Sequence, residues 1–234
     1  MFPVAILAGG LATRLHPITK TIPKSLLEVG GRPFIARQLE YLQKQGVRHV
    51  VLCIGYLGGM IQAVVGNGER FGLRISYSPD GATLLGTGGA LKQALPLLGE
   101  HFFILYGDSF LPVDFSAVQQ AYTQSGQQAL MTVLKNGDRW DKSNVLFADG
   151  QLIEYNKRAP RPEMAYIDYG LGVVSGHVLA DYPLDQPFDL ADVYQTLSVK
   201  GQLAGLEVHG RFYEIGSYNG LKEAEEYFLT NESV

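Results

Sequence analysis

The stretch LAGGLATRLHPITKTIPKSLL, residues 7–27, decides the fold that we expect of this chain. A short apolar strand, residues 4–7, leads directly into a loop of small residues, and two cations, Arg14 and Lys24, follow it. Backbone N–H groups in such a loop can bind phosphate oxygens, and the cations can neutralise more of the charge. The loop residues expected to contact a nucleotide are Leu7, Ala8, Gly9, Gly10, Ala12 and Thr13. The stretch therefore predicts a binding site for a triphosphate.

Two other phosphate-binding motifs do not fit this stretch. The pattern GxxxxGK[ST] is absent, because Lys24 and Ser25 follow a proline rather than a glycine. The dinucleotide pattern GxGxxG fails because Ala12 and Leu15 stand where its later glycines are required. An ordinary tight turn between a strand and a helix would explain the glycines, but it would not explain the two cations that follow.

The composition is that of an ordinary globular protein with room for one α/β domain. The chain has 234 residues, a net charge of -4 and 46% hydrophobic residues. Lys and Arg are scattered along it, which argues against a nucleic-acid partner. The single cysteine, Cys53, lies in an apolar run and is expected to be a buried thiol. We recognise neither a signal peptide nor an apolar span, and expect a cytoplasmic protein without membrane contact.

The first half of the chain alternates between two kinds of apolar pattern. Residues 33–45 and 57–65 have apolar side chains at helical spacing, so we expect two amphipathic helices there. Near-continuous apolar runs predict buried strands at residues 47–54, 73–77 and 101–106. This alternation predicts a Rossmann-like α/β fold, in which a mainly parallel sheet is covered by helices on both faces.

The second half of the chain is richer in short strands. A hairpin is expected around Asp149-Gly150, a dipeptide that favours tight turns. A terminal helix is expected after residues 212–217. The expected strands are residues 129–135, 144–148, 151–155, 166–174 and 203–208. We interpret this half as a mixed-sheet extension of the parallel half.

One carboxylate stands out in the first half. Asp108 follows the strand at residues 101–106 in the sequence Gly107-Asp108-Ser109. A side chain just beyond the carboxyl end of a parallel strand projects into the crevice where open α/β sheets bind ligands. A Gly-Asp pair alone is only a turn signal. The strand before it and the loop upstream make Asp108 a candidate functional residue.

Residues 7–42 resemble the opening signature of the sugar-1-phosphate nucleotidyltransferases, or nucleotide-sugar pyrophosphorylases, LAxGxGTRLxPLTxxxPKxLLxVxGKPxIxxxLExL. Ala12 replaces a glycine of that signature, which requires backbone angles that a Cβ tolerates. The resemblance implies a nucleotide-diphospho-sugar transferase fold in one domain, residues 1–234. Residues 1–125 would mainly bind the nucleotide and residues 126–234 mainly the sugar phosphate. No acyltransferase-type tail is expected.

The resemblance also implies roles for residues of the nucleotide half. Arg14 and Lys24 would be catalytic, with Arg14 holding the β- and γ-phosphates and Lys24 bridging the α-phosphate and the incoming phosphate. LGTGGAL, residues 85–91, resembles a segment that lies against the nucleobase. Its contact residues would be Gly86, Thr87 and Gly88. A helix N-cap at Thr87 is an alternative that can hold at the same time.

Further roles fall on the metal and sugar-phosphate sites. Asp108 matches an aspartate that coordinates Mg²⁺, and Glu214 stands where the family has a second metal-binding aspartate. EYNK, residues 154–157, resembles a segment whose lysine meets the sugar phosphate, although an exposed hairpin lysine is the alternative. DYGLG, residues 168–172, resembles a segment that places a small residue against the sugar. The expected sugar-phosphate residues are Asn144, Glu154, Lys157, Asp168 and Gly170.

The implied activity is Mg²⁺-dependent transfer of a nucleotidyl group from a nucleoside triphosphate to a sugar 1-phosphate. The chain most resembles the small guanylyltransferases of mannose or manno-heptose 1-phosphate, so GTP is favoured. Cytidylyl, uridylyl or thymidylyl transfer to another phosphorylated acceptor is an alternative. A catalytically silent sensor or regulatory subunit is another, favoured by Ala12 and Glu214. A dinucleotide-dependent oxidoreductase is disfavoured. Members of the family often form dimers, so the resemblance leaves a homo-oligomer as an alternative to a monomer.

Overall fold

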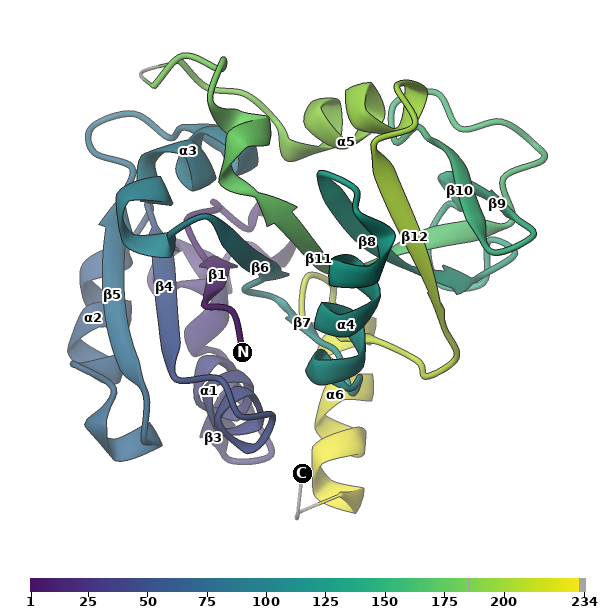
Figure 1. The fold of residues 1–234 in the computed structure, drawn as a ribbon. Helices are drawn as coiled ribbons and strands as arrows, with labels where there is room; N and C mark the ends of the chain where they lie inside the picture. The colour runs from purple at the N-terminus through teal and green to yellow at the C-terminus, as the bar shows by residue number, and fades with distance from the viewer. Residues whose placement is uncertain (185, 232–234) are drawn as a thin grey trace.

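The parallel half of the sheet forms as the sequence predicts. The computed structural model describes residues 1–184 and 186–231, which build one nine-stranded sheet with helices on both faces (Figure 1). Four neighbouring strands run parallel in the order β5-β4-β1-β6. They are β5 (Arg74–Pro79), β4 (His49–Ile54), β1 (Val4–Leu7) and β6 (His101–Tyr106). Their carboxyl ends therefore meet at one edge.

The remaining strands make the sheet mixed. Strand β11 is antiparallel to both β6 and β8, whereas β12 is parallel to β8. Asp149 and Gly150 both have positive φ, 51° and 74°, as the tight turn between β9 and β10 requires. These strands are β8 (Ala129–Lys135), β9 (Val145–Ala148), β10 (Gln151–Tyr155), β11 (Tyr166–Ser175) and β12 (Leu203–Val208). The expected mixed-sheet extension is confirmed.

Helices cover the two faces of the sheet because strand residues alternate in direction. Val4 and Ile6 pack with α1, α2 and α4, whereas Ala5 packs with α3 and α5 on the opposite face. The bounds are α1 (Phe34–Lys44), α2 (Gly58–Val65), α3 (Gly86–Leu98), α4 (Phe115–Ser125) and α5 (Leu190–Val199). Both faces are thus buried, which explains the near-continuous apolar runs of the central strands.

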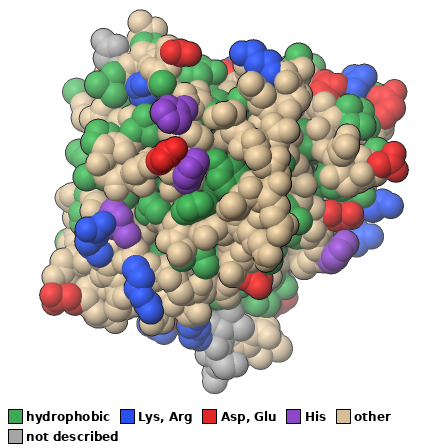
Figure 2. Space-filling model, viewed as in Figure 1, with side chains coloured by type: hydrophobic (Ala, Val, Ile, Leu, Met, Phe, Trp, Pro, Cys, Tyr) green, Lys and Arg blue, Asp and Glu red, His purple; other side chains and the backbone are tan. Residues whose placement is uncertain are grey.

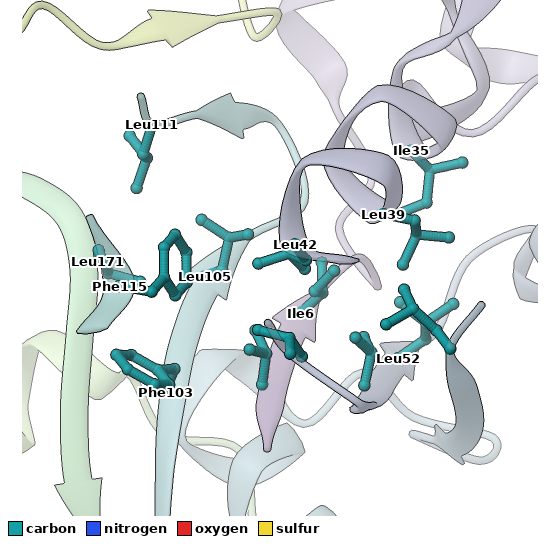
Figure 3. Packing of buried hydrophobic residues seen from close by; sticks show 14 of the residues in the cluster. Ile6, Ile35, Leu39, Leu42, Leu52, Phe103, Leu105, Leu111, Phe115 and Leu171 are labelled. Carbon is teal, nitrogen blue, oxygen red and sulfur yellow. The ribbon is translucent and has the colours of Figure 1, made fainter. Parts of the chain in front are cut away.

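Helix α1 shows how the first face is packed. Its side chains Ile35, Leu39 and Leu42 point toward the sheet residues Ile6 and Leu52 (Figure 3). The spacing of the three α1 residues places them on one side of the helix. All five side chains are buried, so α1 is fixed firmly beneath the strands that end at the candidate site.

A smaller unit attaches the end of the chain to the sheet. Strands β7 (Ser109–Phe110) and β13 (Tyr213–Glu214) form an antiparallel ribbon, and α6 (Tyr218–Thr230) packs against it. The rings of Phe110 and Phe228 lie 4.7 Å apart. A second ribbon joins β2 (Glu28–Val29) and β3 (Arg32–Pro33). This arrangement brings residues 213–217 beside residues 108–110.

Helices α4 and α5 were not expected from the apolar pattern. Each begins at an aspartate, because Asp114 accepts hydrogen bonds from the N–H groups of Ser116 and Ala117, and Asp189 accepts one from Ala191. The aspartates were the available sequence signal. The alternative N-cap at Thr87 is wrong, since α3 begins at Gly86 and has no side-chain cap.

The exposed surface is mixed in character. On the face shown in Figure 2, acidic and basic side chains are spread over the periphery in small groups of both signs. In the part of the chain that the structure describes, no helix has both the length and the apolar character that crossing a bilayer requires.

The packing of α1 gives a direct test of the fold. Leu39 is fully buried, whereas Leu229 on α6 is 59% exposed. Leu39→Ala should lower the free energy of unfolding by about 2–5 kcal/mol, because it leaves a cavity in the core. Leu229→Ala, the matched control, should change it by less than about 0.5 kcal/mol. Urea denaturation measures both, and equal losses would contradict the packing in Figure 3.

Candidate active site

A cleft lies where the parallel strands end. Its first cavity, about 250 Å³, is lined by residues that follow β1, β5 and β6 and by Cys53 near the end of β4. The predicted residues in its wall are Leu7, Ala8, Gly9, Gly10, Lys24, Gly86, Thr87 and Asp108. Cys53 also lines it and is buried as expected, and burial raises the pKa of its thiol to about 12. The cavity occupies the position that the carboxyl ends of parallel strands favour for ligands.

A second cavity, about 420 Å³, opens beside the first toward the mixed half of the sheet. The two share Tyr106 and Asp108 in their walls, so they are two parts of one cleft that meet at Asp108. The predicted residues that line the second cavity are Arg14, Asp108, Asn144, Lys157, Asp168, Gly170 and Glu214. Side chains from both halves of the chain therefore face a common space.

The loop after β1 is held open by contacts at its start. Ala8 N–H donates to the carbonyl of Cys53, and Tyr56 N–H donates to the carbonyl of Gly9. Within residues 1–184 and 186–231, none accepts a hydrogen bond from the N–H groups of residues 9–12. These donors are the groups that the sequence analysis expected to be available for phosphate oxygens.

Ala12 has backbone angles that a Cβ tolerates only at a cost in free energy. Its φ and ψ are 50° and 44°, in the left-handed region that costs an L-residue roughly 1–2 kcal/mol. The buried Thr19 hydroxyl donates to the carbonyl of Ala12 at 2.8 Å. This contact helps to hold the loop in a conformation that glycine would adopt more easily.

The two cations are carried by short 3₁₀ turns and lie in different parts of the cleft. Lys24, in the turn Lys24–Leu26, places Nζ 2.5 Å from Asp108 Oδ2. This ion pair joins the loop region to the end of β6. Arg14, in the turn Thr13–Leu15, lines the second cavity. A further 3₁₀ turn, Ile18–Lys20, lies between them.

Asp108 is fixed by a residue that the sequence analysis missed. Gln38 Nε2 donates to the carbonyls of Tyr106 at 2.9 Å and Ser109 at 2.8 Å, on either side of Asp108. Gln38 is only 2% exposed and lies among the apolar residues of α1. A polar residue on a buried helix face was the available signal. On the other side, Ile215 N–H donates to the Asp108 carbonyl at 2.9 Å.

Glu214 lies opposite Ser109 in the β7–β13 ribbon, one residue from Asp108. Its Oε2 accepts a hydrogen bond from Gly216 N–H, and its Oε1 accepts one from the Ser217 hydroxyl, both at 2.5 Å. The carboxylate therefore reaches the beginning of α6. Gly220 makes room for it, since a Cβ at Gly220 would lie 1.9 Å from Glu214 Oε1.

Gly216 is a second residue that the analysis of single motifs did not select. A Cβ at this position would lie 2.7 Å from Glu214 Oε2, 2.9 Å from Arg14 Nη2 and 3.3 Å from Asp108 Oδ2. Three charged groups therefore converge on the space beside one glycine. Any side chain at Gly216 would have to displace at least one of them.

Asp108 and Glu214 offer a chemically suitable place for a hard divalent cation. Both carboxylates line the second cavity from adjacent positions, and each carboxylate oxygen has a lone pair beyond its present contact. Mg²⁺ commonly binds one or two carboxylates together with phosphate oxygens and water. Among the described residues, no three His, Cys, Asp or Glu side chains form a metal-binding group.

A bulge in β11 shapes the second cavity. The pairing of β11 with β8 slips between Asp168 and Gly172, so the residues between them leave the regular ladder. The buried Thr132 hydroxyl donates to the carbonyl of Leu171 at 2.6 Å within this slip. Asp168 and Gly170 consequently face the cavity, and Asn144 Oδ1 accepts a hydrogen bond from Asp168 N–H.

Asp168 has an unusual electrostatic environment. Burial raises the pKa of its carboxyl from the ordinary 3.8 to about 6, against the lowering effects of Gly170 N–H and the Lys157 ammonium. Gly170 N–H donates to Asp168 Oδ1 at 2.9 Å. The charge of Asp168 therefore changes at a higher pH than that of an ordinary aspartate.

The segment expected to contact a nucleobase is also tied to α5. The Thr87 hydroxyl donates to Asp189 Oδ1 and accepts from Leu190 N–H, each at 2.8 Å. Gly88 is buried against Phe188, where a Cβ would come within 2.3 Å of the ring. Phe188 had no detectable sequence signal, because its contact with Gly88 depends on the fold.

Four predicted residues do not line either cavity. They are Ala12, Thr13, Gly88 and Glu154. Glu154 instead forms an ion pair with Arg161 at 2.5 Å. Conversely, Trp140, Asp141 and Phe212 line the second cavity without having been predicted. They come from loops, where neither helical nor strand spacing marks a functional side chain.

The fold and the cleft define an α/β protein with two adjoining cavities at the carboxyl ends of its parallel strands and beside them, where proteins of this architecture bind ligands. The chain belongs to the nucleotidyl transferase family, whose model matches residues 4–143. This confirms the resemblance found in the sequence. The HddC protein of Yersinia pseudotuberculosis, whose crystal structure is a complex with GMP-PN, has a TM-score of 0.80 at 24% identity. That match covers 97% of this chain and 100% of HddC, and confirms the expected fold.

Curated relatives carry names from one group of sugar-phosphate enzymes. The N-acetylmuramate alpha-1-phosphate uridylyltransferase of Neisseria meningitidis is 30% identical over 94% of this chain and 95% of its own length. The D-glycero-alpha-D-manno-heptose 1-phosphate guanylyltransferase of Campylobacter jejuni is 28% identical over 97% and 98%. The mannose-1-phosphate guanylyltransferase catalytic subunit beta of Danio rerio is 29% identical over 90% of this chain. The chain spans 60% of that protein's length.

The raised pKa of Asp168 predicts a pH-dependent stability. Between about pH 4 and pH 6 the folded form binds more protons than the unfolded chain, so its stability should fall as the pH rises through this range. Asp168→Asn removes this loss. The free energy of unfolding of Asp168→Asn, measured relative to the wild type, should therefore be higher at pH 7.5 than at pH 4.5.

Urea denaturation at the two pH values measures this difference. Asp149→Asn, on the exposed hairpin, is the matched control. If Asp168→Asn changes the free energy of unfolding by the same amount at both pH values, the raised pKa assigned to the burial of Asp168 would be contradicted.

Proposed function

We propose that this chain catalyses Mg²⁺-dependent transfer of a nucleotidyl group from GTP to a sugar 1-phosphate of the mannose or manno-heptose type. The products would be a nucleotide sugar and pyrophosphate. One observation carries the proposal: a cavity bordered by a phosphate-binding type of loop meets a second cavity bordered by Lys157, and Asp108 belongs to both. Membership of the nucleotidyl transferase family supports this reading.

The two cavities differ in a way that suits the two substrates. The first has backbone donors after β1 and Lys24 at its edge, which suit a triphosphate. The second has Lys157 in its wall, which can hold the phosphate of a sugar 1-phosphate. Two substrates bound in this manner would bring their phosphates together near Asp108. Such positioning removes much of the entropic barrier of a two-substrate reaction.

The reaction itself needs little covalent assistance. A phosphate oxygen of the sugar 1-phosphate attacks the α-phosphorus and forms a new O–P bond. The bond from the α-phosphorus to the bridging oxygen breaks, and pyrophosphate leaves with the electron pair. The nucleophile is already an anion, so no base has to remove a proton from it. Catalysis therefore depends on alignment and on neutralising negative charge.

Named residues can supply that neutralisation. Lys24 would act on the α-phosphate and the incoming phosphate, because its ion pair with Asp108 places it where the cavities meet. Arg14, beside Asp108 and Glu214, would act on the phosphates that crowd this point. Asp108 and Glu214 would hold Mg²⁺, which when bound screens the phosphate anions from one another.

The choice of GTP and of the acceptor draws on the relatives. Two of the three relatives described above are named as guanylyltransferases, of mannose and manno-heptose 1-phosphates, and the third as a uridylyltransferase. UTP with an amino-sugar phosphate is therefore the main competing pair. A cytoplasmic location stays a prediction of the sequence.

A substrate grid tests the proposed reaction. Pyrophosphate release is measured with MgCl₂, each of GTP, UTP, CTP, dTTP and ATP, and mannose, manno-heptose, glucose or N-acetylmuramate 1-phosphate. Release should require both substrates and be fastest with GTP and a mannose-type acceptor. No release with any pair, while nucleotide still binds, would contradict the transferase and support a regulatory role.

Variants of the shared wall should abolish most of this activity. Lys24→Ala and Asp108→Asn should each lower turnover by on the order of a hundredfold. The first removes a cation that stabilises phosphate charge in the transition state, and the second removes a carboxylate that would hold Mg²⁺. Lys222→Ala, on the exposed side of α6, is the control and should keep wild-type turnover. Near-normal turnover in both site variants would contradict the assignment.

A further inference from the structure

The second cavity has an excess of negative side chains. Its wall contains two cations, Arg14 and Lys157, and four carboxylates. The carboxylates are Asp108, Asp141, Asp168 and Glu214. In the proposed function, Asp108 and Glu214 serve the cation and the cations serve the phosphates. Asp141 and Asp168 are then left facing the rest of the acceptor.

The loop that carries Asp141 is rigidly built. Asn136 Nδ2 donates to the Asp141 carbonyl at 2.6 Å and to Ser143 Oγ at 3.2 Å. Ser143 N–H donates to Asp138 Oδ1 at 2.7 Å. Asn136 and Ser143 are 5% and 3% exposed, so a buried polar network fixes the loop. The backbone of Asp141 is thereby fixed beside Trp140 at the cavity wall, and the exposed Asp141 carboxylate accepts a hydrogen bond from Lys142 N–H at 2.7 Å.

Aromatic rings form the adjoining wall. The Trp140 and Phe212 ring centroids lie 5.9 Å apart at 68°, and those of Tyr169 and Phe212 lie 6.0 Å apart at 84°. All three residues line the second cavity. The Trp140 and Phe212 rings offer apolar surface to the C–H groups of a sugar ring, with Tyr169, only 2% exposed, supporting Phe212. The neighbouring carboxylates can accept hydrogen bonds from the sugar hydroxyls.

The nearby guanidinium groups do not reverse this charge. Arg139 and Arg211 place Cζ 5.4 Å and 5.5 Å from the Trp140 ring centroid. Arg211 also forms an ion pair with Glu223. Neither arginine is among the described residues that line the cavity. The sugar side of the cavity therefore combines aromatic surface with carboxylates.

We propose that Trp140, Asp141 and Asp168 select a neutral, hydroxyl-rich sugar 1-phosphate and reject an acceptor whose sugar carries a carboxylate. A carboxylate on the sugar would face Asp141 and Asp168, and like charges brought together oppose binding. In the proposed function, the two cations of the cavity wall, Arg14 and Lys157, are engaged with the phosphates. The inference rests on the proposed function, since it requires that the second cavity hold the acceptor. Asp141 and Trp140 act here as specificity-determining residues.

A matched pair of acceptors tests this selection. Mannose 1-phosphate and mannuronate 1-phosphate differ by a carboxylate in place of a hydroxymethyl group, and N-acetylmuramate 1-phosphate is a second acidic probe. The values of kcat/KM are measured with the nucleotide that the wild type uses best. Acceptor binding is measured in parallel by calorimetry. The wild type should prefer the neutral acceptor by at least about tenfold.

Variants at position 141 then locate the effect. Asp141→Lys should shift the neutral-to-acidic ratio toward the acidic acceptors by at least about tenfold, and Asp141→Asn should shift it less in the same direction. Asp149→Lys, on the exposed hairpin outside the cavity, is the control and should leave the ratio unchanged. Thermal melting verifies that each variant is folded. If Asp141→Lys is not folded, the acceptor ratio of Asp141→Asn tests the inference.

The outcomes separate the inference from the proposed function. A wild type that prefers either acidic acceptor, or a ratio unaffected by both Asp141 variants, would overturn the inference while leaving the transferase intact. Failure of every tested acceptor to support pyrophosphate release would instead contradict the proposed function. In that case the calorimetric ratio still tests whether Asp141 disfavours acidic sugar phosphates.

Discussion

The position of Asp108 is the constraint on which the cleft depends. Its side chain pairs with Lys24, and its carbonyl accepts a hydrogen bond from Ile215 N–H. Gln38 holds the carbonyls on either side, while Gly107 N–H donates to the carbonyl of Leu7. Four parts of the chain, distant in sequence, thus meet around one residue. Because Asp108 belongs to the walls of both cavities, fixing it also fixes their relative position.

Much of the fold could be predicted because its signals are local. The apolar runs predicted the central strands, and the spacing of Ile35, Leu39 and Leu42 predicted α1. The dipeptide Asp149-Gly150 predicted the hairpin. The loop residues around Gly9 and the carboxylate at Asp108 could be placed for a similar reason. Both directly follow parallel strands, whose carboxyl ends meet at one edge of the sheet.

The rest of the site could not be predicted because it depends on contacts between distant segments. Gln38 is recognisable only once α1 is seen beneath the end of β6, and Phe188 only once it packs against Gly88. Trp140 and Asp141 reach the second cavity through a loop whose conformation is set by buried polar groups. Neither hydrophobic periodicity nor a short motif records such contacts.

Gly220 is required by the backbone of Glu214 as well as by its side chain, and this double contact restricts how the chain can diverge. A Cβ at position 220 would lie 2.5 Å from the Glu214 carbonyl oxygen, a contact that does not depend on which side chain position 214 carries. The same Cβ would also collide with the Glu214 carboxylate. A shorter aspartate at position 214 would relieve only the second contact. Position 220 is therefore expected to keep glycine whether position 214 carries glutamate or aspartate.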